Sequence, residues 1–136
     1  MSKTPTEIVK GVIDLFADET KWAQGAFAFT SPVDGYEPDV VSSHDEEAVC
    51  FCIMGAVDRV AGGSLFQNGC GMQHKYPEEV VVAEALIAEV GDEFSVKDER
   101  APYDPIAQWN DMEDRTIGDV RDLMQRTLKR LEAEAA

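Results

Sequence analysis

Three cysteines and a histidine are the residues of this 136-residue sequence whose types could support metal binding or covalent catalysis. Cys50 and Cys52 are two positions apart, and Cys70 lies in an Asn-Gly-Cys-Gly run four residues before His74. Thiolate and imidazole are common zinc ligands. A Cys-His pair beside glycine amides could instead supply a nucleophile, a base and an oxyanion site. The sequence therefore raises two hypotheses, a zinc site and a small hydrolase or transferase.

Geometry and charge argue against both hypotheses. Residues i and i+2 of a predicted helix point about 200° apart, so Cys50 and Cys52 cannot both face one metal ion. Cys52 falls on an apolar stripe, where cysteine usually acts as a small hydrophobic residue. An acidic environment raises a thiol pKa and disfavours the thiolate. We expect reduced thiols, no metal and no cofactor, and we keep Cys70 and His74 as the candidate catalytic pair.

Capping signals divide the first two thirds of the chain into predicted elements. Thr4-Pro5-Thr6-Glu7 predicts a helix that runs to about Lys21. A second capping box at residues 43–46 predicts a helix through Val60, which Gly62-Gly63 would end. The glycine-containing segment 64–76 is interpreted as an irregular loop. Pro77 then begins a third helix, which would end at Gly91.

Alternation, turn signals and caps predict the remaining elements. Residues 26–36 alternate weakly and predict a short extended segment or β-hairpin. Residues 92–105 predict an exposed connection, and Asp104-Pro105 a short helical turn. Thr116 and Asp119 predict the start of a long last helix with one apolar stripe. The sequence thus predicts a mainly α protein: a single compact helical domain over residues 1–136, with about four to five helices.

Charge limits the partners of this domain. The chain has 27 acidic and 12 basic residues and a formal net charge of −15. The excess lies in residues 1–114, because residues 115–136 contain four acids and five bases. Such a charge repels DNA, RNA and anionic lipid and attracts basic surfaces. We expect a basic protein partner, no direct nucleic-acid binding and no membrane binding, although adaptation to a salty cytoplasm would also explain the composition.

The acids without a capping role are the candidate residues for binding that partner. Glu78 and Glu89 share one predicted outward direction on the third helix. The candidate set is Glu78, Glu89, Asp92, Glu93, Asp98, Glu99, Asp111, Glu113 and Asp114. If these carboxylates gather on one face, they could imitate the phosphates of a duplex, since a duplex about 35–40 Å long carries roughly 20 of them. Nucleic-acid mimicry and inhibition of a host protein by a phage protein are the forms of binding that we expect.

A third function class is structural. Val80, Val81 and Val82 spread apolar side chains around most of the third helix. This surface could form a homo-oligomer contact. No apolar run reaches the roughly 18 residues of a membrane span, and the first residues lack the apolar core of a signal peptide. We therefore expect a cytoplasmic protein, in the host cytoplasm if the gene is from a phage.

The sequence Trp109-Asn110-Asp111 is interpreted as an aromatic anchor followed by Asx turns that lead into the last helix. Together with Trp22-Ala23-Gln24-Gly25-Ala26 and the segment from Ala48 to Ala56, it resembles an uncharacterised family of small bacterial and phage proteins. The resemblance covers residues 22–123 and implies a small helical protein without an established activity. It also implies one architectural unit made of Trp22, Cys52, Gly55, Trp109 and Asn110.

Overall fold

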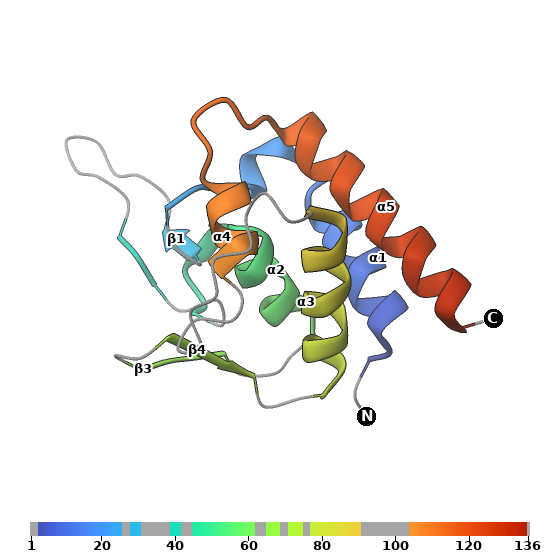
Figure 1. Ribbon diagram of the computed structural model, residues 1–136. Helices are drawn as coiled ribbons and strands as arrows, with labels where there is room; N and C mark the ends of the chain where they lie inside the picture. Colours follow the sequence, from blue (N-terminus) through green and yellow to red (C-terminus); the bar gives the residue numbers. More distant parts are fainter. Residues whose placement is uncertain are drawn as a thin grey trace.

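The structure is a computed structural model that describes residues 3–25, 28–30, 39–41, 45–61, 65–68, 71–74, 77–90 and 104–135. Within these residues the fold is mainly α, as the sequence predicts (Figure 1). The helices are α1 (Pro5–Leu15), the short 3-10 helix η1 (Glu19–Lys21), α2 (Ile53–Ala61), α3 (Pro77–Val90), α4 (Asp104–Asn110) and α5 (Ile117–Ala135). The strands are β1 (Ala28–Thr30), β2 (Ala48–Phe51), β3 (Leu65–Asn68) and β4 (Gly71–His74).

The first helix begins where its capping box predicts. The Glu7 amide donates to Thr4 Oγ1 over 3.2 Å, and the Thr4 amide donates to Glu7 Oε1 over 3.1 Å. The helix ends at Leu15, however, so the prediction that it continues to Lys21 is wrong. Asp18 interrupts it, because its carboxylate accepts from the amide and hydroxyl of Thr20 and starts η1 instead.

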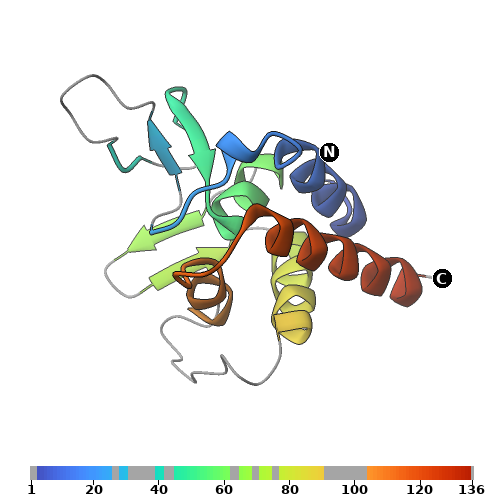
Figure 2. The same ribbon diagram turned by 90° about the horizontal axis from the view of Figure 1, so that it is seen from above.

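The last helix also begins at its predicted cap. The Thr116 amide donates to Asp119 Oδ2 over 3.0 Å, and the Asp119 amide donates to Thr116 Oγ1 over 3.2 Å. Val120, Leu123 and Met124 are fully buried on the predicted apolar stripe. With this stripe α5 crosses both α1 and α3, which lie on either side of it in the second view (Figure 2).

The core centres on α2. Residues 53–58 of this helix are buried, and α1, α3 and α4 pack around it. Gly11 of α1 lies close to Val60 of α2, because a Cβ atom at position 11 would overlap Val60 Cγ1. A hydrogen atom at this position therefore sets how tightly α1 can lie against α2.

The prediction that the second helix includes residues 48–51 is wrong. These residues form β2, which pairs antiparallel with β1 in the register Ala28↔Phe51, Phe29↔Cys50 and Thr30↔Ala48. β1 lies within the predicted extended segment, whose other residues, like Ser43 of the predicted cap, lie outside the described residues. Backbone pairing with β1 overrides the helical spacing of the apolar residues, so α2 begins only at Ile53.

The interpretation of residues 64–76 as an irregular loop is also wrong. β3 and β4 form an antiparallel pair in which Leu65 faces His74 and Asn68 faces Gly71. Only Gly69 and Cys70 separate the paired ends in the sequence, and two-residue loops favour tight hairpins, often with glycine as their first residue. The glycine that indicates a turn is therefore also compatible with a hairpin. Within the described residues, no helix is long and apolar enough to cross a membrane.

Candidate functional site

The side chain of Asn110, which ends α4 and is fully buried, makes four hydrogen bonds. Its Oδ1 accepts from the Trp22 indole Nε1 over 2.8 Å and from the Ile53 amide over 3.1 Å. Its Nδ2 donates to the Ala23 carbonyl over 3.0 Å and to Asp111 Oδ1 over 2.9 Å. An amide group has two donors and two acceptor lone pairs. Every hydrogen-bonding position of Asn110 is therefore used inside the fold, and none faces a ligand.

Neighbouring residues extend this network. Gln24 Nε2 donates to the Asn110 carbonyl over 2.9 Å and to the Met112 carbonyl over 2.8 Å. The Gly25 amide donates to Asp111 Oδ1 over 2.9 Å, and Gly25 has a φ of +98°, which a glycine adopts without strain. The segment after η1 is thus bound to the connection between α4 and α5.

The network also caps α2. Asn110 accepts from the first helical amide, that of Ile53, while the Gly55 amide donates to Cys52 Sγ over 3.3 Å. These contacts satisfy N-terminal amides that would otherwise lack partners. The structure thus brings Trp22, Cys52 and Asn110 of the implied architectural unit to the start of α2, with Gly55 in the same turn. Asn110 makes long-range contacts here rather than the Asx turn expected of it.

Trp109 lies beside this network with 7% of its surface exposed. The Arg115 guanidinium lies 3.7 Å from the centroid of the indole ring, and its Nε donates to the Trp109 carbonyl over 2.9 Å. A cation over an aromatic face is stabilising. The roles of Arg115 and Gln24 are not evident from the sequence. For Arg115 the available signal is its position six residues after Trp109.

The thiols that the structure describes are poor nucleophiles. Cys52 is buried, and burial raises its pKa from 9.0 to about 12, so the thiol stays protonated at neutral pH. Burial also raises the pKa of the half-buried Cys50. Cys70 and the side chain of His74 lie outside the described residues, so the Cys-His hydrolase or transferase stays a prediction.

Cys50 belongs to β2, so the helical spacing expected to direct Cys50 and Cys52 apart does not apply to it. Among the residues that the structure describes, no group of three or more His, Cys, Asp and Glu residues could hold a metal ion.

The acidic candidate residues differ in exposure and in ion pairing. The prediction that Glu89 points outward is wrong: its carboxylate is 15% exposed and binds Arg130 Nε at 2.6 Å and an Arg126 guanidinium nitrogen at 3.4 Å. Glu78 is half-buried on α3, whereas Asp111, Glu113 and Asp114 are exposed between α4 and α5. The remaining candidates, Asp92, Glu93, Asp98 and Glu99, lie outside the described residues.

A second acidic segment joins the exposed carboxylates of residues 111–114. Arg121 of α5 donates from Nε to the Phe16 carbonyl over 3.0 Å and from a terminal nitrogen to the Ala17 carbonyl over 2.8 Å. Together with the bonds of Gln24, these contacts bring η1 to the start of α5. We call this region the acidic end; its carboxylates belong to Asp18, Glu19, Asp111, Glu113, Asp114, Asp119 and Asp122.

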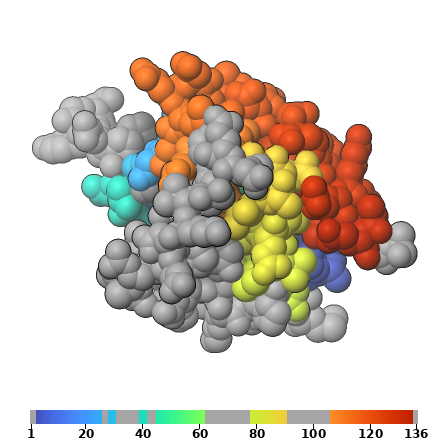
Figure 3. Space-filling model, in the orientation of Figure 1, coloured from blue at the N-terminus to red at the C-terminus, as the bar shows by residue number. Residues whose placement is uncertain are grey.

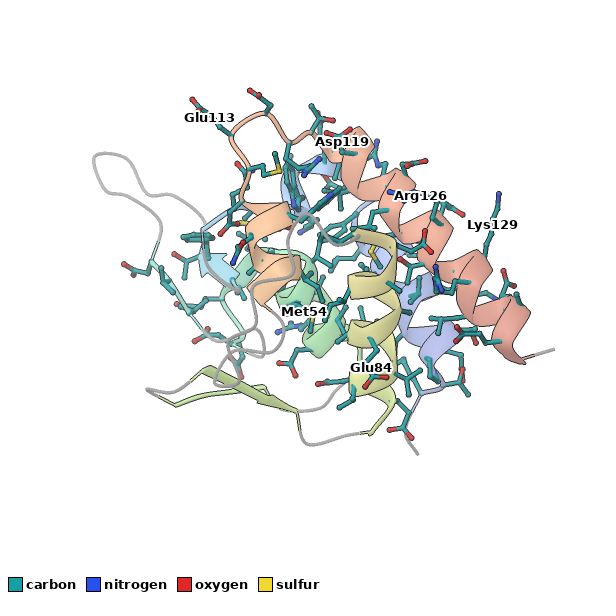
Figure 4. All side chains as sticks on the ribbon, viewed as in Figure 1. Met54, Glu84, Glu113, Asp119, Arg126 and Lys129 are labelled. Atoms are coloured by element: carbon teal, nitrogen blue, oxygen red, sulfur yellow. The ribbon has the colours of Figure 1, made fainter. Side chains whose placement is uncertain are left out.

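Few free cations offset these carboxylates. The basic residues of the same segments are Lys21, Arg115 and Arg121, and the last two are engaged with Trp109 and with backbone carbonyls. Hydrogen bonds from Thr20 lower the pKa of Asp18, which keeps it ionised. Figure 4 shows Glu113 projecting from the loop and Asp119 at the start of α5. Arg126 pairs with Asp122 at 3.0 Å and offsets that charge, whereas Glu19, Glu113 and Asp114 are exposed, so the acidic end is a negatively charged surface.

The family comparison covers nearly the whole chain. Residues 1–130 match a model described as "Family of unknown function (DUF6197)". The chain belongs to this family. Membership in DUF6197 agrees with the predicted resemblance to an uncharacterised family. No curated protein and no solved structure matches the chain.

Proposed function

We propose that this member of DUF6197 is a non-enzymatic binding protein whose acidic end engages a basic surface of another protein. The observation that carries the proposal is the acidic end itself, where carboxylates from η1, the α4–α5 connection and α5 share one surface. Clustered charge of one sign steers an oppositely charged partner and sets the specificity of the encounter.

An apolar side chain in the same surface supports binding to protein. Met112 is 37% exposed and lies between Asp111 and Glu113, with its sulfur 2.7 Å from a guanidinium nitrogen of Arg115. A flexible methionine can fit irregular partner surfaces. Its position among carboxylates favours a partner that combines lysine or arginine with an apolar contact.

The partner class that we propose is a nucleic-acid-binding protein. A duplex presents about one negative charge per 1.7 Å of axis, so a face of clustered carboxylates competes for the same basic groove. Such mimicry would make the protein an inhibitor in the cytoplasm, of a bacterial host if the gene is from a phage. Because Glu89 pairs with Arg126 and Arg130, its carboxylate is not part of the surface that would imitate phosphates.

Matched charge variants test the proposal. The acidic-end variant carries Glu19→Gln, Glu113→Gln and Asp114→Asn, three exposed side chains outside the Asn110 network. The control variant carries Glu46→Gln, Glu47→Gln and Glu132→Gln, which are also exposed and change the net charge equally. Affinity capture from lysate of the native host, at low and at high salt, compares the two variants with the unmodified protein.

We expect the unmodified protein and the control variant to capture the same basic protein at low salt. The acidic-end variant should lose most of this capture, and high salt should weaken it for all three proteins because ions screen exposed charges. Equal capture by both variants would contradict the proposal, since net charge rather than the acidic end would then determine binding.

A further inference from the structure

A groove crosses the exposed face of α3 between the start of α1 and the end of α5. Its larger part has a volume of about 340 Å³, and its lining includes Pro5, Val81, Leu131 and Glu134. A smaller hollow of about 130 Å³ shares Val81 and Glu134 and continues over Ala85 and Ala88. Figure 3 shows α3 at the surface beside α5, with α1 next to them. The two hollows together form what we call the α3 groove.

The floor of the α3 groove is formed by apolar side chains. Val81, Ala85 and Ala88 are spaced by four and three residues, so they share one face of α3. Val81 is 41% exposed, which is unusual for an aliphatic residue in this fold, whereas the adjacent Val82 is fully buried. The three valines 80–82 therefore do not form one contact surface as expected; Val81 alone faces the groove.

The rim of the α3 groove is negative. Glu84 and Glu134 are exposed at its edge, and Glu84 projects from α3 in Figure 4. The cation that lines the groove, Arg130, has its charge offset by Glu89 at 2.6 Å. An occupant thus meets an apolar floor and two carboxylates, and among the described residues that line the groove no cation is free to compensate them.

We propose that the α3 groove binds an amphipathic segment of a basic protein. An aliphatic side chain of that segment lies between Val81 and Leu131, and flanking lysine or arginine side chains pair with Glu84 and Glu134. Helix-in-groove recognition uses apolar anchors of this kind, and charges at the rim select the partner. This inference rests on the proposed function, because it gives the same basic partner a second contact away from the acidic end.

A second copy of the chain fits the α3 groove poorly. Each copy carries a formal charge of −15. In a two-fold symmetric contact the same patch meets itself, which would place the carboxylates of Glu84 and Glu134 against those of the second copy. Charge complementarity therefore favours a basic segment over self-association.

The test uses a defined probe, a fluorescein-labelled 14-residue helical peptide made of leucine and lysine with leucine on one face. Fluorescence anisotropy measures its Kd for the unmodified protein, for Val81→Asp and for Val40→Asp. Val40 is 64% exposed and lies next to β1, so the second variant adds the same charge outside the α3 groove. A control peptide with glutamine in place of leucine keeps the charge and removes the apolar face.

Recognition by the α3 groove and attraction by net charge alone predict different results. We expect Val81→Asp to weaken binding at least fivefold relative to Val40→Asp, although both variants are more negative than the unmodified protein. Attraction by net charge alone predicts equal or tighter binding by Val81→Asp. That result, or no binding of the peptide to the unmodified protein, overturns the inference.

Amide chemical shifts separate this inference from the proposed function. Peptide-induced changes at residues 81–88 and 131–134 support the α3 groove. Changes confined to residues 18–19 and 111–122 overturn it and leave the acidic end as the interface. Sedimentation at two concentrations completes the test, because self-association of the unmodified protein that Val81→Asp abolishes would assign the groove to a second copy and overturn the inference.

Discussion

The indole Nε1 of Trp22 donates a 2.8 Å hydrogen bond to Oδ1 of Asn110, a residue 88 positions later in the chain. The same oxygen accepts from the first amide of α2. One side chain therefore connects the segment after η1, the start of α2 and the end of α4. Since Asn110 is fully buried, water cannot replace any of these partners at low cost.

Replacing Asn110 should destabilise the fold more than the loss of its side-chain volume alone would. Asn110→Ala leaves the indole of Trp22 and the amide of Ile53 without their acceptor, and each buried unpaired group costs about 1–3 kcal/mol. We expect a loss of about 3 kcal/mol in the free energy of unfolding, measured by urea denaturation. Gln108→Ala is the control, because Gln108 is exposed on the same helix. A loss below about 1 kcal/mol for Asn110→Ala would contradict a central role for the network.

Two glycine substitutions should have opposite consequences. In Gly11→Ala the new methyl group overlaps Val60 Cγ1, so the Val60 side chain or the two helices must shift, at a cost of about 1–3 kcal/mol. In Gly118→Ala the nearest atom, Thr116 Oγ1, is 3.6 Å away, and alanine favours the helix. Thermal denaturation should give a lower Tm for Gly11→Ala and an unchanged or higher Tm for Gly118→Ala. A similar Tm for both variants would show that α1 and α2 adjust freely.

Cys52 should make stability depend on alkaline pH. Burial raises the pKa of its thiol to about 12 from the ordinary 9.0, so the unfolded chain loses the proton first as pH rises. The stabilisation is complete below pH 9 and is lost between pH 9 and 12, by up to about 1.4 kcal/mol per pH unit. Urea denaturation at pH 8, 9.5 and 10.5 should therefore show a steeper decline for the unmodified protein than for Cys52→Ala. Parallel declines would refute this role of Cys52.

The contact of Glu89 with Arg130 should be measurable as a coupling. Glu89→Gln and Arg130→Gln, alone and combined, form a double-mutant cycle, and we expect a coupling free energy of about 0.5–1 kcal/mol because both side chains are partly exposed. Glu84→Gln, on the exposed face of the same helix, should change stability by less than about 0.5 kcal/mol. A coupling near zero would mean that Glu89 is available to a partner, as the sequence analysis expected.

Local signals in the sequence predict where the first and last helices begin. The reciprocal bonds of Thr4 with Glu7 and of Thr116 with Asp119 join residues three positions apart, so the pattern contains everything that forms them. Ala48–Phe51 shows the limit of this reasoning. Its apolar spacing suits a helix and a strand equally, and the partner that selects the strand, Ala28–Thr30, lies about twenty positions earlier.

The candidate site joins residues that are even farther apart in the sequence. Trp22 and Asn110 can be singled out as motif residues, but nothing near either one indicates that they bind each other. Glu89 is similar, because its helical position predicts exposure and only the packing of α3 on α5 brings Arg126 and Arg130 to it. Charge composition predicts a basic partner, whereas the acidic end and the α3 groove follow from which helices lie together.

The cap that Asn110 provides to α2 limits when the core can form during translation. α2 forms the centre of the core, yet an acceptor for its first amide comes from a residue 57 positions later. A nascent chain that ends before residue 110 lacks this acceptor, and one that ends before α5 leaves the apolar faces of α1 and α3 uncovered. We expect that α5 must be synthesised before the core can close, and that no N-terminal fragment ending before α5 folds by itself.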